Sequence, residues 1–80
     1  MAEKQWNVQV KITESDRLTE AAATLVGNSS PLVGEGTARR NPADVNVAAI
    51  GDELATARAL SDLSHQLLHA ATEIVQAHNR

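Results

Sequence analysis

The residues best suited to hold a metal ion are His65, His69 and Glu73, which recur at intervals of four. On a helix this spacing places all three on one face, where neighbouring pairs could bind one ion through imidazole nitrogen and carboxylate oxygen. The order of residues is not the HExxH of a metalloprotease. Two histidines beside a carboxylate also arise readily on a solvated helix face, and we favour that interpretation. Metal binding stays as the alternative, and we expect no cofactor.

The sequence offers no other machinery for catalysis. It has no cysteine to act as a thiol nucleophile and no glycine-rich loop of the Walker type. The run of residues 34–36, Gly-Glu-Gly, lacks the third glycine of a dinucleotide-binding loop. We therefore expect a protein that is not an enzyme and that takes no small-molecule substrate.

The overall charge argues against broad binding to nucleic acid. Seven Lys and Arg against ten Asp and Glu give a formal net charge of −3, opposite in sign to the surface that phosphate attracts. Lys11, Arg39 and Arg40 are the cations that could gather near one sheet edge and contact RNA, and such binding would be weak and salt-sensitive. The alternative, which we favour for the arginines, is that one of them pins the following loop by bonding Asp44 or Asp52.

Three segments have the features of β-strands that form a meander. Residues 6–12 alternate apolar and polar side chains, which is typical of a strand with one buried face. Residues 18–26 and 32–39 lie between turn signals and complete the sheet. Ala21, Ala23 and Leu25 should face inward, as should Gly34 and Gly36, which we interpret as seats for a closely packed helix. The alternative is an edge strand that tolerates glycine.

Residues 47–77 have the propensity of one long helix, with Asn46 as a plausible N-cap and Gly51 as the weak point near its start. Such a helix would be about 46 Å long, whereas a compact chain of 80 residues is only about 30 Å across. Its far end should therefore need a partner, and a second copy is the simplest one. The expected dimer interface comprises Leu63, Leu67, Ala70, Ile74 and Val75. The alternative is a helix that breaks near Ser64 and folds back.

Taken together, these elements predict a single domain over residues 1–80 with an α+β fold, in which a three-stranded antiparallel meander precedes one long C-terminal helix. The absence of cysteine fits a reducing compartment. The opening residues do not resemble a signal peptide, and no apolar run is long enough to cross a membrane. We expect a soluble cytoplasmic protein.

Three stretches of the sequence resemble a known family. They read GEGTARRNPAD at residues 34–44, IGDELA at 50–55 and ARALSDL at 57–63. These strings are similar to those of small actinobacterial proteins classed as a domain of unknown function, and the similarity covers about residues 5–68. The resemblance implies a fold like that of double-stranded-RNA-binding domains. It also implies a dimer, since some members are dimeric, induced in dormancy and compared with ribosome hibernation-promoting factors.

The sequence and the resemblance together predict a non-enzymatic, dimeric binding protein associated with stress or dormancy, with the ribosome or RNA as the candidate partner. One alternative is a protein–protein interaction module that never contacts nucleic acid. The other is a metal-binding protein that uses the helix histidines.

Overall fold

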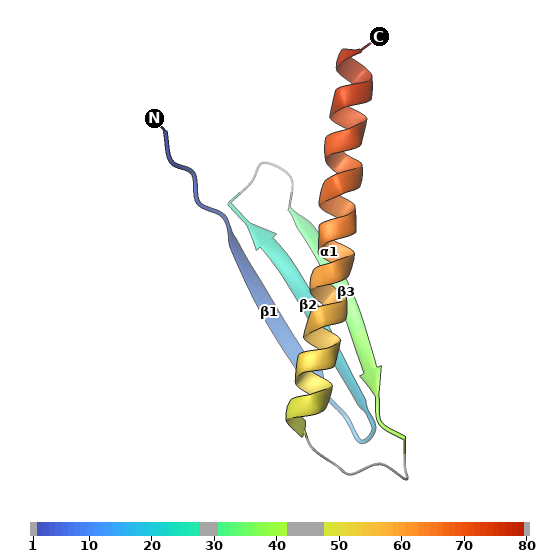
Figure 1. Cartoon of the computed structure of the whole chain (residues 1–80). Coiled ribbons are helices and arrows are strands. Elements are labelled where there is room, and N and C mark those ends of the chain that lie inside the picture. The colour runs from blue at the N-terminus through green and yellow to red at the C-terminus, as the bar shows by residue number, and fades with distance from the viewer. Residues whose placement is uncertain (1, 28–30, 42–47, 80) are drawn as a thin grey trace.

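The computed structural model describes residues 2–27, 31–41 and 48–79. Three antiparallel strands follow one another in space as in sequence, β1 (Asn7–Glu14), β2 (Leu18–Val26) and β3 (Leu32–Arg39), and the helix α1 (Ala48–His78) lies across one face of the sheet (Figure 1). This confirms the predicted α+β fold and its β-β-β-α order. The predicted N-cap, Asn46, lies outside the described residues.

The strand register separates the sheet into two faces. Val10 of β1 pairs with Ala23 of β2, which in turn pairs with Gly34 of β3, and paired residues point to the same face. The buried residues identify this as the inner face, against α1. The core consists of Ala21, Ala23, Leu25, Ala38, Ala55, Ala59 and Leu63. Most of these residues are alanine, so the helix and sheet pack closely but bury little apolar surface.

Two glycines of β3 allow the helix to approach. A Cβ placed on Gly34 would lie 2.7 Å from the Cβ of Leu63, and one placed on Gly36 would lie 2.7 Å from the Cβ of Arg58. Real Cβ atoms do not come so close, and the nearest atoms also include the helix backbone at Ala59. β3 is an edge strand, but its glycines serve as seats for α1, as predicted.

The helix α1 runs unbroken for 31 residues and extends well past the sheet (Figure 1). The chain accordingly measures 54 × 28 × 18 Å along its principal axes. Every described residue beyond Ala70 is exposed. The alternative of a helix broken near Ser64 is therefore wrong, and the predicted overhang is confirmed. Within the described residues, no helix combines the length and apolarity needed to cross a membrane.

The prediction of a buried face on the first strand is wrong for the isolated chain. All eight residues of β1 are exposed, because α1 crosses β2 and β3 and diverges from β1 toward its own C-terminus (Figure 1). The sheet thus has an apolar inner face that its own helix only partly covers.

Candidate interaction surface

The uncovered part of the inner face is formed by Val8, Val10 and Ile12 of β1, which we call the β1 apolar face. Their pairing partners on β2 are the buried residues Leu25, Ala23 and Ala21, so these three side chains point to the side on which α1 lies. They nevertheless remain 44%, 37% and 42% exposed, and Trp6, just before the strand, is 52% exposed. A row of large apolar side chains left in water is typical of an interaction site.

The edge of β3 shows which side of α1 faces away from β1. Arg58 Nη1 donates to the carbonyl oxygen of Thr37 at 2.7 Å, and Gln66 Nε2 donates to that of Val33 at 2.8 Å. Between them, the backbone N–H of Glu35 donates to Asp62 Oδ2 at 2.8 Å. These side chains satisfy outward-pointing backbone groups of an edge strand. Three residues of α1 thus hold the helix to the edge of β3.

On the opposite side, toward β1, α1 carries what we call the lateral seam, formed by Leu60, Ser64, Leu67, Ala71 and Ile74. These residues recur at alternating intervals of four and three. At about 100° per residue, they lie about 60° to 140° around the helix from Ala59, which touches the sheet, in the direction away from the β3-bonded side chains. Leu60 is 42% exposed and Ile74 is 61% exposed. The seam therefore lines the open space over β1.

A second apolar row runs along the back of α1, pointing away from its own sheet. We call it the back seam, and it comprises Ile50, Leu54, Ala57, Leu68 and Val75. Its large members are 42% to 67% exposed. The seams and the β1 apolar face together account for most of the large hydrophobic side chains that the described chain leaves in water.

The predicted interface residues separate into two groups. Leu63 is 3% exposed and belongs to the core of its own chain, and Leu67 packs against that core. Ala70 is half-buried where α1 leaves the sheet, whereas Ile74 and Val75 lie fully on the overhang. Sequence reasoning missed the β1 apolar face, because alternation indicates which side chains share a face but not whether anything covers it.

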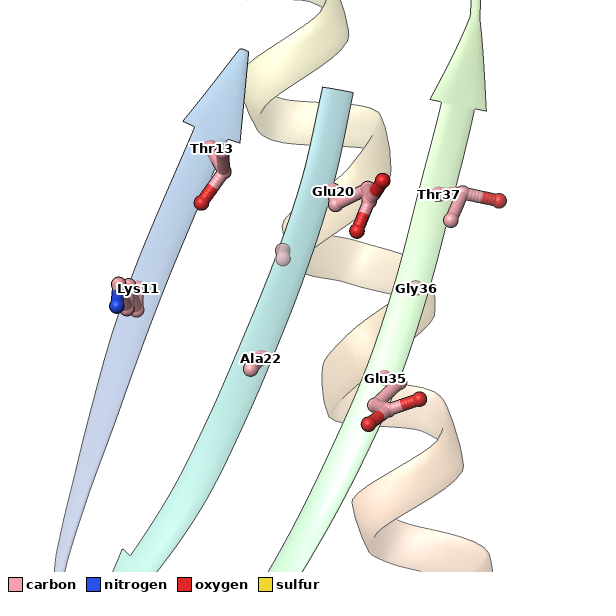
Figure 2. Close-up of a pocket in the computed structure, with 8 residues that line it drawn as sticks. Lys11, Thr13, Glu20, Ala22, Glu35, Gly36 and Thr37 are labelled. Carbon is pink, nitrogen blue, oxygen red and sulfur yellow. The ribbon is translucent and has the colours of Figure 1, made fainter. Parts of the chain in front are cut away.

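The predicted RNA-contacting cations do not all gather at one place. Lys11 and Arg39 lie on the outer face of the sheet, on opposite edge strands and four residues apart in register. Together with the two strand spacings between them, this places their Cα atoms about 16 Å apart. Glu20 lies between them on β2, and Glu35 lies level with Lys11 on β3. Lys11, Glu20 and Glu35 surround a shallow depression of about 230 Å³ over the small side chain of Ala22 (Figure 2).

Two of the predicted cations, Arg39 and Arg40, lie near a third arginine at the end of the sheet near the start of α1. The backbone N–H of Arg40 donates to the carbonyl oxygen of Arg17 at 2.8 Å, and Arg39 pairs with Leu18. We call Arg17, Arg39 and Arg40 the arginine corner. No sequence pattern pointed to Arg17 as a neighbour of these arginines, because only the β1–β2 turn brings it to the end of β3. Of the two predicted pinning partners, Asp44 lies outside the described residues and Asp52 lies against Glu14.

The helix histidines lie on the β3 side of the overhang. His69 Nε2 lies 3.2 Å from Glu73 Oε1, and both side chains are largely exposed. With His65 they line a hollow where α1 passes Leu32. Across residues 2–27, 31–41 and 48–79, no group of three or more His, Cys, Asp or Glu side chains is placed to hold a metal ion.

A pair of carboxyl groups connects the end of β1 to the start of α1. Asp52 raises the pKa of Glu14, first by hydrogen bonding to its carboxyl group and then by charge repulsion. Asp52 Oδ1 is buried and has no hydrogen-bond partner. Two carboxylates so close cannot both ionise freely, so this contact is sensitive to pH.

Comparison with known proteins gives a consistent result. A family model described as Rv2632c-like matches residues 4–80. The chain is 49% identical over 74 residues to the uncharacterized protein MT1780 of Mycobacterium tuberculosis (strain CDC 1551 / Oshkosh), covering 92% of this chain and 79% of that protein. It is 47% identical over 74 residues to the uncharacterized protein Rv2632c of M. tuberculosis (strain ATCC 25618 / H37Rv), covering 92% and 80%. The crystal structure of Rv2632c superposes with a TM-score of 0.90 at 45% identity, covering 98% of this chain and 93% of that one.

Proposed function

The chain belongs to the Rv2632c-like family, and from that premise we propose that it is a non-enzymatic binding protein whose working form is a homodimer. The observation that carries the proposal is the β1 apolar face. Val8, Val10 and Ile12 point to the core side of the sheet and yet stay exposed. In a stable soluble protein such a surface is typically covered by a partner.

The energy available from covering these surfaces is comparable with the cost of association. Six side chains, Trp6, Val8, Val10, Ile12, Leu60 and Ile74, are on average close to half exposed. Burying a large apolar side chain completely is worth about 1.5 to 3 kcal/mol, so the remaining exposed halves in two copies are worth about 8 to 16 kcal/mol. Association costs about 4 to 15 kcal/mol in lost freedom. The two ranges overlap, so these six side chains alone offset the cost of association. A micromolar dimer needs a net of about 8 kcal/mol, and it must therefore bury further apolar surface of α1 as well.

Sedimentation equilibrium on the full chain tests this proposal directly. We expect twice the chain mass of 8.5 kDa at micromolar concentration, with dissociation on dilution. A chain that remains monomeric throughout the micromolar range would show that these surfaces do not bind each other. Binding of a different protein, retained after nuclease treatment, would then be the remaining use of the same face.

A second candidate function is contact with the ribosome or RNA, as in the hibernation factors that related proteins have been compared with. The arginine corner favours it, because Arg17, Arg39 and Arg40 meet at one end of the sheet and arginine binds phosphate well. A role in stress or dormancy would follow from such binding. The net charge of −3 requires the contact to be local and salt-sensitive.

Co-sedimentation with ribosomes at low salt tests this candidate. The variant Arg39→Glu/Arg40→Glu should abolish it, whereas Lys4→Glu/Lys11→Glu changes the net charge equally at a distance from the arginine corner and should weaken binding only slightly. Equal losses would indicate non-specific attraction. Titration with zinc tests the metal-binding alternative at His65, His69 and Glu73, and we expect no binding heat above that of buffer.

A further inference from the structure

The three uncovered apolar surfaces restrict how two copies can fit together. We infer that the copies pack face to face, with the two α1 helices side by side and parallel between the two sheets. The α1 of each copy then covers the β1 apolar face of the other. This inference rests on the proposed homodimer and specifies its arrangement.

The width of the sheet leaves room for one more helix. Strands lie about 4.8 Å apart and a helix is about 10 Å wide, so α1 can cover β2 and β3 but not β1 as well, as the structure shows (Figure 1). Packed helices lie about 8 to 10 Å apart. A second helix beside α1 would therefore lie over β1 and contact Val8 and Val10.

The lateral seam has the spacing that two parallel helices need. Leu60, Ser64, Leu67, Ala71 and Ile74 alternate at intervals of four and three, the a and d positions of a heptad repeat. The seam starts above the sheet and continues along the overhang. It would therefore join the two helices both between the sheets and beyond them, where each overhang otherwise stands in water.

The back seam is covered only if a sheet lies on that side of the helix. Ile50, Leu54, Leu68 and Val75 point away from their own sheet and are 42% to 67% exposed. In the face-to-face arrangement the sheet of the second copy lies over the part of this seam that faces the sheets, at Ile50, Leu54 and Leu68, whereas Val75 lies on the overhang beyond both sheets. Pairing of two β1 edges in one continuous sheet would instead leave the back seam exposed, so it accounts for fewer of the apolar side chains.

Symmetry then fixes the direction of the helices. A two-fold axis that exchanges the two sheets and keeps the helices beside each other must run along the helices between them. Equivalent residues of the lateral seam therefore meet each other across the axis. In an antiparallel pair each residue would instead meet one from the opposite end of the seam.

The charged side chains of α1 permit this arrangement. Between Leu54 and Ala77 the charged residues are Arg58, Asp62 and Glu73, and all three lie on the side of the helix toward β3. Arg58 and Asp62 are already bonded to that strand. Packing these seams between Leu54 and Ala77 against a second copy therefore buries apolar and small residues without burying an unpaired charge. Glu53, one heptad before Leu60, is exposed on the lateral side, and the arrangement requires it to stay at the solvated rim of the interface.

Disulfide formation in single-cysteine variants tests the arrangement, because the natural chain has no cysteine. Ser64→Cys and Ala71→Cys lie on the lateral seam, and each should form a disulfide with its counterpart in the second copy on mild oxidation. Gln76→Cys lies on the same exposed overhang but on the β3 side, and is the matched control. We expect at least tenfold slower cross-linking for the control.

Mass measurements separate the arrangement from the proposed homodimer. Far-UV circular dichroism first checks that each variant folds. Dimers by mass that fail to cross-link at both seam positions, or that cross-link equally at the control, would overturn the parallel arrangement and leave the homodimer standing. Monomers by mass, in the natural chain as well as the variants, would overturn both.

Discussion

Replacing one residue of the β1 apolar face should break the dimer without harming the fold of the chain. Val10 is 37% exposed and lies on the inner face, whereas Val33 is 42% exposed and lies on the outer face. In an isolated chain Val10→Asp and Val33→Asp should therefore have similar, small effects. In the dimer only the aspartate at position 10 is buried against a second copy. The two variants thus form a matched pair.

The exposed fraction of Val10 sets the dimerisation free energy that Val10→Asp should lose. Each copy loses the 37% of the valine side chain that only the partner covers, worth about 0.7 kcal/mol. Burying an unpaired carboxylate costs several kcal/mol, and we take about 2 kcal/mol as a minimum for a site at the rim of the sheet. Two copies make this about 5 kcal/mol, which corresponds to an increase of about 10³- to 10⁴-fold in the dissociation constant.

Sedimentation equilibrium measures this constant, and the emission of Trp6, the sole tryptophan, gives a second signal that should shift toward the red as the dimer dissociates. Val10→Thr provides a milder change if Val10→Asp does not fold. If Val10→Asp dimerises like the natural chain, the β1 apolar face is not part of the interface. The same conclusion follows if Val33→Asp weakens the dimer by the same factor.

Three further changes test the packing within one chain by urea unfolding. Gly34→Ala should cost about 3 kcal/mol, because its Cβ would meet Leu63 at 2.7 Å. Gly51→Ala is the control, since its Cβ would come closest to a side-chain oxygen, that of Thr19 at 2.8 Å. If Gly34→Ala loses less stability than the control, β3 does not need glycine at this position to pack against α1. Asp62→Ala should cost about 1 kcal/mol and expose the amide of Glu35 to hydrogen exchange, whereas unchanged exchange would show that the bond at 2.8 Å is not formed in solution. The raised pKa of Glu14 means that the folded chain holds this proton more tightly than the unfolded chain, so stability should fall as pH rises above about 4.5, the ordinary value. Asp52→Asn should remove this part of the pH dependence, and identical profiles for both proteins would refute the assignment.

The sequence predicted most of the fold because its local signals agree with one another. The bounds of β2 and β3 are as predicted, and the alternation of Leu32, Gly34, Gly36 and Ala38 correctly placed one face of β3 against the helix. The first strand was expected from residue 6 to 12, and the structure places it at Asn7–Glu14. The length of the helix alone was enough to predict its overhang.

The surface was harder to predict than the elements. Because α1 is tilted across the sheet, Leu63 is buried in the core and Val10 is left uncovered. No local sequence pattern indicates this tilt. The same limit applies to the arginine corner. Arg17 lies next to Arg40 only because the β1–β2 turn ends where β3 ends, which depends on strand register and not on distance along the chain.

The bonds from Arg58, Asp62 and Gln66 to the margin of β3 also bear on how far self-assembly can go. With one margin occupied by its own helix, a sheet has a single margin left at which another strand could be added. Among the described strands, further strands could therefore be added only at the margin of β1, and the margin of β3 is closed to such growth by side chains of its own helix.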